Sequence, residues 1–332
     1  MGSVRKYFLF LVITLLSFWG QTAIVLADAP PPPEAAGKTD PEVINFFKDI
    51  EVHGVVSSSY LNNFNDPINR RNNLRAFDFT SNSFKFDAGI LTLKKDAAKP
   101  GDIGFRTDMA YGYSIPSVSK SAPGLTTATG ARIINDDFDV IQGFVSYNAP
   151  IGTGLRLDLG KFVTSIGVEV IPGPDGWNNH FSNSWLFTYG PYTHTGLRAT
   201  YAVNEKLSLQ GMVVNGWDNT VDTNNGKTVH TGITYTPLSN VSLIFNWIGG
   251  PEPQTNDTIN ENKWRNLYDT VVTIGLTDKL RLTLNADYGQ EDNAVTLGKT
   301  AEWWVFGGYL RYDLNKWFSL NLRGETFNDR DG

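Results

Sequence analysis

Pairs of oppositely charged residues stand two positions apart in segments where polar and apolar residues alternate. Arg106 and Asp108 form one such pair, and Arg156 and Asp158 form another. Successive side chains of a strand project to opposite faces, so the two residues of each pair lie on one face and their apolar neighbours lie on the other. Charges on such a face either select ions in a water-filled passage or form salt bridges that stabilise its wall. The candidates for this pore-lining face are Arg106, Asp108, Arg156, Asp158, Arg198, Arg281, Asp287, Arg323 and Glu325.

A second group of reactive side chains lies in the irregular stretch 166–191, which contains His180, Ser182 and Ser184. Hydrolytic catalysis requires a base within hydrogen-bond reach of the nucleophile and a third group that orients the base. Nothing in the sequence fixes that geometry, and polar loops of this length contain such residues by chance. We therefore predict that the protein is not an enzyme.

Composition limits the other kinds of site. The chain has no cysteine, which excludes disulfides, thiol catalysis and cysteine-ligated metals. Its four histidines are scattered without metal-ligand spacing, and it has no glycine-rich phosphate loop. The sequence thus predicts neither a metal nor a cofactor. A formal net charge of −6 without basic clusters argues against a nucleic-acid partner.

The N-terminus has the pattern of a secretory signal peptide. Arg5 and Lys6 precede an apolar run that is too short for a comfortable membrane span. We therefore assign 1–27 to the signal peptide and 28–49 to a Pro-rich periplasmic leader with room for one short helix. The folded domain is expected at 50–332.

From residue 50 the chain is a succession of segments with strand periodicity. Most approach the 9–11 residues that a tilted strand needs to cross a bilayer, and nothing after residue 27 is apolar for the roughly 18 residues of a membrane helix. We predict thirteen strands, at 50–60, 83–94, 102–113, 137–147, 155–165, 192–202, 207–216, 229–236, 241–248, 264–276, 280–288, 301–312 and 317–327.

The connections between these strands alternate strictly between long loops and short turns. This alternation is typical of outer-membrane barrels, whose turns lie in the periplasm and whose loops lie outside. Because every backbone polar group in lipid must be paired internally, such strands have to close on themselves. The sequence therefore predicts an all-β, transmembrane, antiparallel up-and-down β-barrel with an apolar outside and a polar inside.

Tyrosine and tryptophan are concentrated at the predicted strand ends, as in the aromatic belts of membrane interfaces. The residues expected near the loops are Tyr113, Trp217, Trp247, Trp264 and Tyr288. Those expected near the turns are Tyr147, Tyr201, Tyr235, Tyr312 and Trp317.

The stretch between the fifth and sixth predicted strands also carries a family resemblance. The residues concerned are Gly160, Lys161, Phe162, Gly167, Asn178, Asn179, Phe187, Thr188, Tyr189, His194, Thr195 and Gly196. In these positions, and weakly at 47–52 and 73–78, the chain resembles the bacterial outer-membrane porins described as putative beta-barrel porin-2, OmpL-like. The likeness fades after about residue 216, where only the strand rhythm continues. The resemblance implies a pore and does not indicate its solute.

We therefore expect an outer-membrane porin that gives small hydrophilic solutes a passive, water-filled path and whose other partner is membrane lipid. The alternative is a non-conducting barrel that acts as a surface adhesin or receptor through its extracellular loops. The stretch 166–191 is expected to fold inward and narrow the pore, with Glu169, Asp175 and His180 at the constriction. The oligomeric state stays open between monomer and trimer.

The predicted number of strands is odd, whereas bacterial single-chain barrels have an even number because both termini lie in the periplasm. With a periplasmic N-terminus, the strand at 317–327 ends outside. The sequence therefore predicts a C-terminal truncation from a barrel of about 14 or 16 strands. We expect either a gapped barrel or strained closure between 50–60 and 317–327.

Overall fold

One antiparallel sheet of thirteen strands dominates the computed structural model, which describes residues 46–118 except 74 and 76, 138–252, 263–292 and 299–330. Each strand pairs with the next one in sequence, without a crossover. The strands are β1 (Glu51–Leu61), β2 (Ser83–Lys95), β3 (Ile103–Tyr111), β4 (Phe138–Ala149), β5 (Leu155–Val163), β6 (Thr193–Asn204), β7 (Leu207–Val214), β8 (Thr228–Leu238), β9 (Val241–Pro251), β10 (Trp264–Gly275), β11 (Leu280–Glu291), β12 (Ala301–Asp313) and β13 (Ser319–Asp329).

All thirteen predicted strands are present, so the all-β, up-and-down fold class is confirmed. The differences lie at the strand ends and in the loops. β9 and β11 each run three residues further into their loops than predicted, whereas β5 ends earlier. Two short helices that the sequence did not predict, α3 (Ile115–Val118) and α4 (Trp185–Tyr189), lie within long connections.

The sheet forms the unit Lys48–Gly332, and Met1–Phe47 cluster as a separate unit. The predicted signal peptide and most of the leader lie outside the described residues and stay predictions. Residues 46–48, which are described, are helical. In the described parts of the chain, no helix is long and apolar enough to span a membrane.

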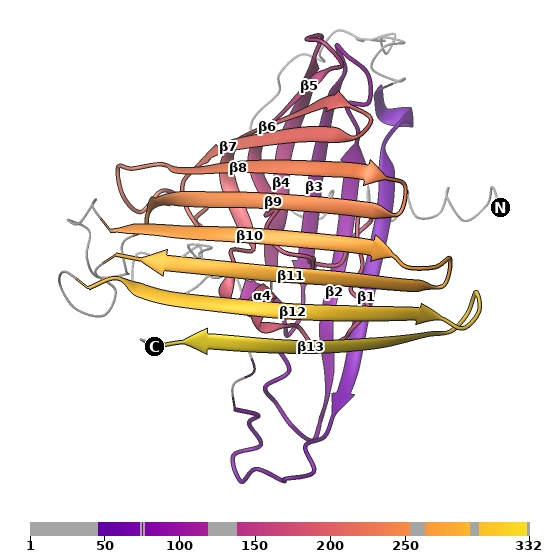
Figure 1. Cartoon of the computed structure of the whole chain (residues 1–332), viewed down its shortest axis with the longest axis vertical. Coiled ribbons are helices and arrows are strands. Elements are labelled where there is room, and N and C mark those ends of the chain that lie inside the picture. Colours follow the sequence, from indigo (N-terminus) through magenta and orange to yellow (C-terminus); the bar gives the residue numbers. More distant parts are fainter. Residues whose placement is uncertain are drawn as a thin grey trace, which may run out of the picture. The chain divides into compact units, whose positions relative to one another are not determined.

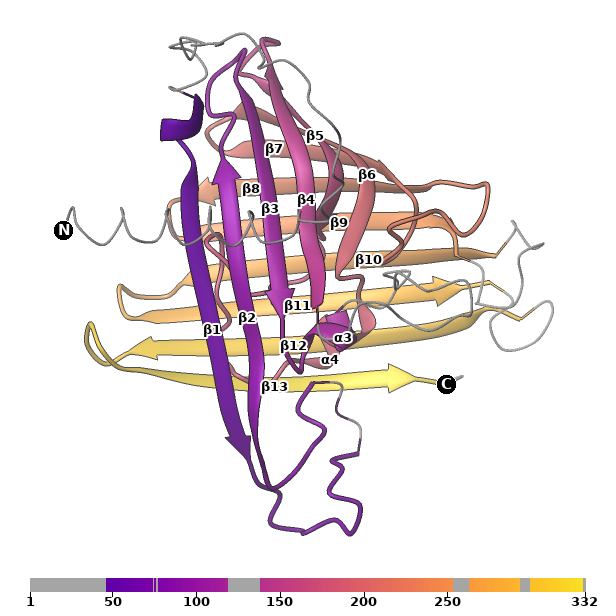
Figure 2. The same ribbon diagram turned by 180° about the vertical axis from the view of Figure 1, so that it is seen from behind.

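The sheet coils strongly along its length. In Figure 1 the strands β1–β4 run steeply across β9–β13, and the reverse view in Figure 2 places the first strands in front of the last ones. The accumulated twist of consecutive strands produces this curvature. Within the described strands, β1 pairs with β2 and β13 pairs with β12, and no ladder joins β1 to β13. The sheet is therefore open between its first and last strands. This is the gapped barrel, one of the two outcomes expected from the sequence.

The two faces of the sheet differ in chemistry. We call the face that carries Asp158, Arg198 and Asp269 the inner face and the other one the outer face. Residues that pair across neighbouring strands lie on the same face, so the register assigns the residues of each strand to a face. Asp158, for example, pairs with Arg198, which pairs with Met212. The outer face is exposed and apolar at Val145, Leu159, Leu197, Val213, Ile233, Phe245, Phe306 and Leu322.

Apolar clusters on the inner face hold the segments that cover it. Ile115 of α3 packs with Ile90 of β2 and Ile141 of β4. Ile166, which follows β5, packs with Ile248 of β9 and Leu267 of β10. The connections after β3 and β5 therefore lie against the inside of the sheet.

Most predicted interfacial aromatics are on the outer face, but two are not. Trp264 and Tyr312 are exposed there as expected, 42% and 41% respectively. Trp217 instead packs on the inner cluster around Ile166, under the Arg265 guanidinium at 5.0 Å. Tyr113 packs against Phe79, with ring centroids 5.2 Å apart. The prediction of an interfacial position was wrong for Trp217 and Tyr113.

Candidate functional site

Two arginines share one carboxylate on the inner face. Asp158 of β5 is in register with Ser146 of β4 and Arg198 of β6. The Asp158 carboxylate accepts hydrogen bonds from Arg156 Nε and Arg198 Nε, each at 2.9 Å, and from Ser146 Oγ at 2.6 Å. The Arg198 guanidinium also lies 4.4 Å from the centroid of the Phe162 ring. Two guanidinium groups share one carboxylate, so this group of side chains has an excess of one positive charge.

A second charged group occupies β2 and β3. Lys94 of β2 is in register with Arg106 of β3. Arg106 Nη2 donates to Asp108 at 2.9 Å, and Lys94 Nζ lies 3.3 Å from Asp96. Asp175, from the connection after β5, pairs with Arg106 and lies 4.0 Å from Lys94. In this group the carboxylates outnumber the cations.

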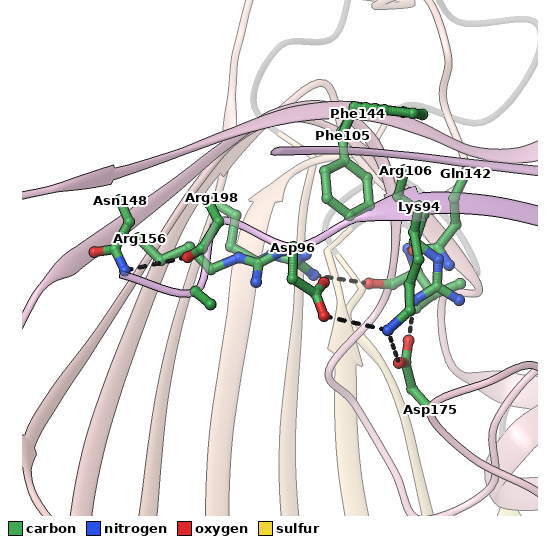
Figure 3. A pocket seen from close by; sticks show the side chains of 13 residues that line it. Lys94, Asp96, Phe105, Arg106, Gln142, Phe144, Asn148, Arg156, Asp175 and Arg198 are labelled. Carbon is green, nitrogen blue, oxygen red and sulfur yellow. Dashed lines mark hydrogen bonds and ion pairs between the residues drawn. The ribbon is translucent and has the colours of Figure 1, made fainter. Parts of the chain in front are cut away.

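A cavity of about 560 Å³ lies between the two charged groups. In Figure 3, Asp96 reaches toward Lys94, and Asp175 lies beside Lys94 and Arg106. The aromatic rings of Phe105 and Phe144 complete the wall. The cavity is therefore polar, with positive charge in excess on one side and negative charge in excess on the other. It opens beside the connection after β5.

That connection, residues 166–191, is called the inward loop from here on. It leaves β5 and reaches β12 and β13 on the far side of the sheet. Glu169 Oε1 accepts from Tyr309 Oη of β12 and lies 3.1 Å from Arg323 Nη1 of β13. The Trp185 N–H donates to Glu325 of β13 at 2.7 Å. The loop is thus anchored, near its start and near its end, to strands far from the two that it connects.

A buried polar network holds the base of the inward loop. His194 Nε2 lies 3.0 Å from Thr164 Oγ1, Asn246 donates to the carbonyl of residue 165 at 3.0 Å, and Asn285 accepts the N–H of residue 168 at 3.0 Å. The Asp269 carboxylate accepts from Asn246 at 2.8 Å and from Asn285 at 2.6 Å. Sequence reasoning missed these amides, although their alternate positions in β9 and β11 point inward.

Two glycines of the resemblance motif allow β5 to lie close to β4 and β6 to lie close to β7. Gly160 and Gly196 pair directly between β5 and β6. A Cβ at Gly160, whose φ is +137°, would lie 2.3 Å from the carbonyl oxygen of Gly143, and one at Gly196 would lie 2.2 Å from that of Val213. Larger residues would therefore push β5 away from β4 at Gly160 and β6 away from β7 at Gly196.

The hydroxyl groups of the inward loop have structural partners. Ser184 caps α4, since its Oγ accepts from the Phe187 N–H at 3.1 Å, and Ser182 Oγ accepts from Arg323 Nη2 at 2.9 Å. His180 packs edge-on against Tyr309, and burial followed by the charge of Arg323 lowers the pKa of its imidazole. The two serine hydroxyls and the histidine ring thus have contacts that hold the loop in place. Across the described ranges, no three His, Cys, Asp or Glu residues are grouped to hold a metal ion.

The structure divides the predicted pore-lining residues into four sets, although register puts all of them on the inner face. Arg323 and Glu325 anchor the inward loop, and Asp287 is buried beside Asp269, with which it is in register. Arg281 is exposed at the start of β11. The cavity and its wall collect Arg106, Asp108, Arg156, Asp158 and Arg198.

Comparison with known proteins gives a family and a fold. Residues 49–332 match the sequence profile of the family described as putative beta-barrel porin-2, OmpL-like. No protein of curated function matches the sequence significantly. Among solved structures, the outer membrane channel DcaP of Acinetobacter baumannii is similar with a TM-score of 0.50 and 12% identity over 86% of this chain and 80% of that one.

Two further structures are more distant in fold. OmpF of Salmonella typhi, in complex with daunomycin, is similar with a TM-score of 0.44 and 12% identity, over 85% of this chain and 92% of its own. The trimer form of OmpT of Vibrio cholerae has a TM-score of 0.43 and 9% identity, over 84% of this chain and 89% of its own.

Proposed function

The chain belongs to the putative beta-barrel porin-2, OmpL-like family, and on this basis we propose that it is an outer-membrane porin for passive diffusion of small hydrophilic solutes. The observation that carries the proposal is the inward loop, which crosses the polar inner face and leaves a charged cavity beside it. A loop that merely capped the surface would have no reason to bond to the middle of β12 and β13. The apolar outer face supports contact with lipid.

We assign the solute path to the cavity between the two charged groups. Its wall carries Arg106, Arg156 and Arg198, and the inward loop contributes Asp175. Charged rings of this kind set ion preference in a water-filled pore. Cations and carboxylates nearly balance around this cavity, so we expect weak selectivity between simple cations and anions.

The three residues expected at the constriction have different parts in this proposal. The Asp175 side chain is 61% exposed and faces the cavity, so it is the residue that meets solutes. Glu169 is 7% exposed and paired with Arg323, so it holds the loop in place. His180 packs against Tyr309 and supports the same anchor.

Reconstitution of the full-length protein in planar bilayers tests the proposal. Stepwise ionic currents are expected, and liposomes that contain the protein should swell in isosmotic arabinose. Liposomes made with heat-denatured protein are the control. A folded protein that gives neither currents nor swelling would refute the porin and leave the adhesin or receptor as the better description.

A further inference from the structure

The charges around the cavity are separated into two sides of opposite sign. The arginine side consists of Arg156 and Arg198 around the single carboxylate of Asp158. The acidic side consists of Asp96 and Asp175, together with Asp108, around the ammonium of Lys94 and the guanidinium of Arg106. The arginine side has one excess positive charge, and the acidic side has one excess negative charge. The cavity is therefore close to neutral as a whole but has a permanent dipole.

Burial decides which of these groups a solute meets. The Asp158 side chain is 2% exposed and the Asp108 side chain 7%, and the bonds to their own arginines already occupy both carboxylates. Arg156, by contrast, is 35% exposed. Asp96 and Asp175 are 51% and 61% exposed. Arg198 is only 14% exposed, and its guanidinium is bonded to Asp158 and lies over the Phe162 ring. The groups that a solute can reach are thus Arg156 on the arginine side and two carboxylates on the acidic side.

We propose that this cavity is a binding site for small zwitterions that carry one carboxylate and one ammonium group, such as amino acids and short peptides. The carboxylate would bind Arg156, with Arg198 adding to the positive potential, and the ammonium would bind Asp96 and Asp175. This inference rests on the proposed pore and names the class of solute that the pore favours.

The physical argument is one of complementarity. A simple anion is attracted by the arginine side and repelled by the acidic side, and the converse holds for a simple cation, so neither gains much from the cavity. A zwitterion oriented along the dipole gains at both ends. Guanidinium groups bind carboxylates with two parallel hydrogen bonds, and an ammonium donates to several carboxylate oxygens at once. The volume of about 560 Å³ leaves space for such a solute together with water.

The experiment compares three solutes of similar size with the full-length protein in planar bilayers at pH 6. They are glycylglycine, which is a zwitterion, N-acetylglycinate, which is an anion, and glycinamide, which is a cation. The readout is the concentration of each solute that halves the ionic current. Glycylglycine should do so at a concentration about 10-fold lower than either analogue, since about 1.4 kcal/mol from the second charged contact corresponds to a factor of ten.

Two variants test which residues bind each end of the zwitterion. In Arg156→Gln the glycylglycine advantage should disappear, while block by glycinamide should be retained or strengthened because a charge that repels the cation is lost. In Asp175→Asn the advantage should also disappear, while block by N-acetylglycinate should be retained or strengthened because a charge that repels the anion is lost. Arg156→Gln keeps Arg198 as the partner of Asp158, so the sheet should fold. The matched controls Lys279→Gln and Asp278→Asn change the same charges in an exposed turn and should leave all three values unchanged.

The possible outcomes separate this inference from the proposed pore. Normal currents and arabinose entry, with equal block by the three solutes, would refute the zwitterion site and leave the pore standing. A glycylglycine advantage that survives both variants would place the binding elsewhere and refute it as well. Absence of both currents and arabinose entry would refute the pore, and the site would fall with it.

Discussion

The ion pair between Glu169 and Arg323 should be the principal attachment of the inward loop to the last strands. Its side chains are 7% and 9% exposed, and the Glu169 carboxylate also accepts from Tyr309 Oη and from the N–H of Ser184. Substitution Glu169→Gln keeps the size and one acceptor but removes the charge. Arg323 would then remain buried without its main counter-ion.

The structure sets the size of the effect. Removal of one partner of a buried ion pair costs about 3–5 kcal/mol. Arg323 keeps Ser182 as an acceptor and has Glu325 at 3.7 Å, so the lower end of that range, about 3 kcal/mol, applies here. At about 1.4 kcal/mol per factor of ten, the ratio of undocked to docked loop should rise about 100-fold.

Single-channel recording should detect this change as more frequent and longer visits to a level of higher conductance. A double-mutant cycle isolates the pair, because Glu169→Gln, Arg323→Gln and the double variant should be strongly non-additive. The control Asp278→Asn should behave like the wild type. Additive effects of the two single variants, or unchanged sublevels in Glu169→Gln, would show that the pair does not hold the loop.

Four further results are expected. Deletion of 172–184 should raise single-channel conductance, and an unchanged value would make this segment a surface cap. Cysteines at Val221 and Glu205 should differ in labelling by an impermeant reagent on intact cells, with only the first accessible, and equal labelling would refute the topology. Burial raises the pKa of Glu252 to about 7, so the carboxyl binds its proton more tightly in the folded protein. The melting temperature should therefore fall as pH rises from about 4.5 to 7 and level off above, and Glu252→Gln should remove this fall. Substitution Val213→Arg on the outer face should lower stability by about 2–4 kcal/mol if the residue lies near the bilayer midplane, measured by refolding into lipid vesicles.

Strand periodicity was sufficient to predict the sheet because a bilayer constrains every strand in the same way. Residues facing lipid must be apolar and those facing water polar, so the alternation extends along each strand. Leu159 and Asp158 are adjacent in sequence, yet Leu159 is 60% exposed on the outer face and Asp158 is buried on the inner one. The parity of the charged residues was readable from the same pattern.

The pattern was insufficient where a glycine interrupts the alternation. Tyr113 follows Gly112, whose φ is +146°, and Trp217 follows Gly216, whose φ is +126°. At each glycine the backbone adopts a conformation that residues with L side chains rarely take. The side chain of the next residue therefore no longer points to the face that strand alternation predicts. Residue type and nearness to a strand end indicated the membrane interface, but the backbone turned both aromatic rings inward.

Partners within the inward loop were also beyond the reach of sequence reasoning. Glu169 and Asp175 are both acidic residues of one irregular stretch, and nothing local distinguishes them. The difference comes from Arg323 on β13 and Arg106 on β3, which lie at opposite parts of the sheet. Which carboxylate is buried and which is exposed is therefore decided by tertiary contacts.

The position of the inward loop has a consequence for the order of assembly. Its anchors are 117 to 154 residues further along the chain, at Asn285, Tyr309 and Arg323. Contacts over such separations form slowly because a long segment must be ordered first. The loop therefore docks only after the last strands have been translocated and paired. Resistance of this loop to protease during biogenesis should thus mark the moment when the sheet is complete.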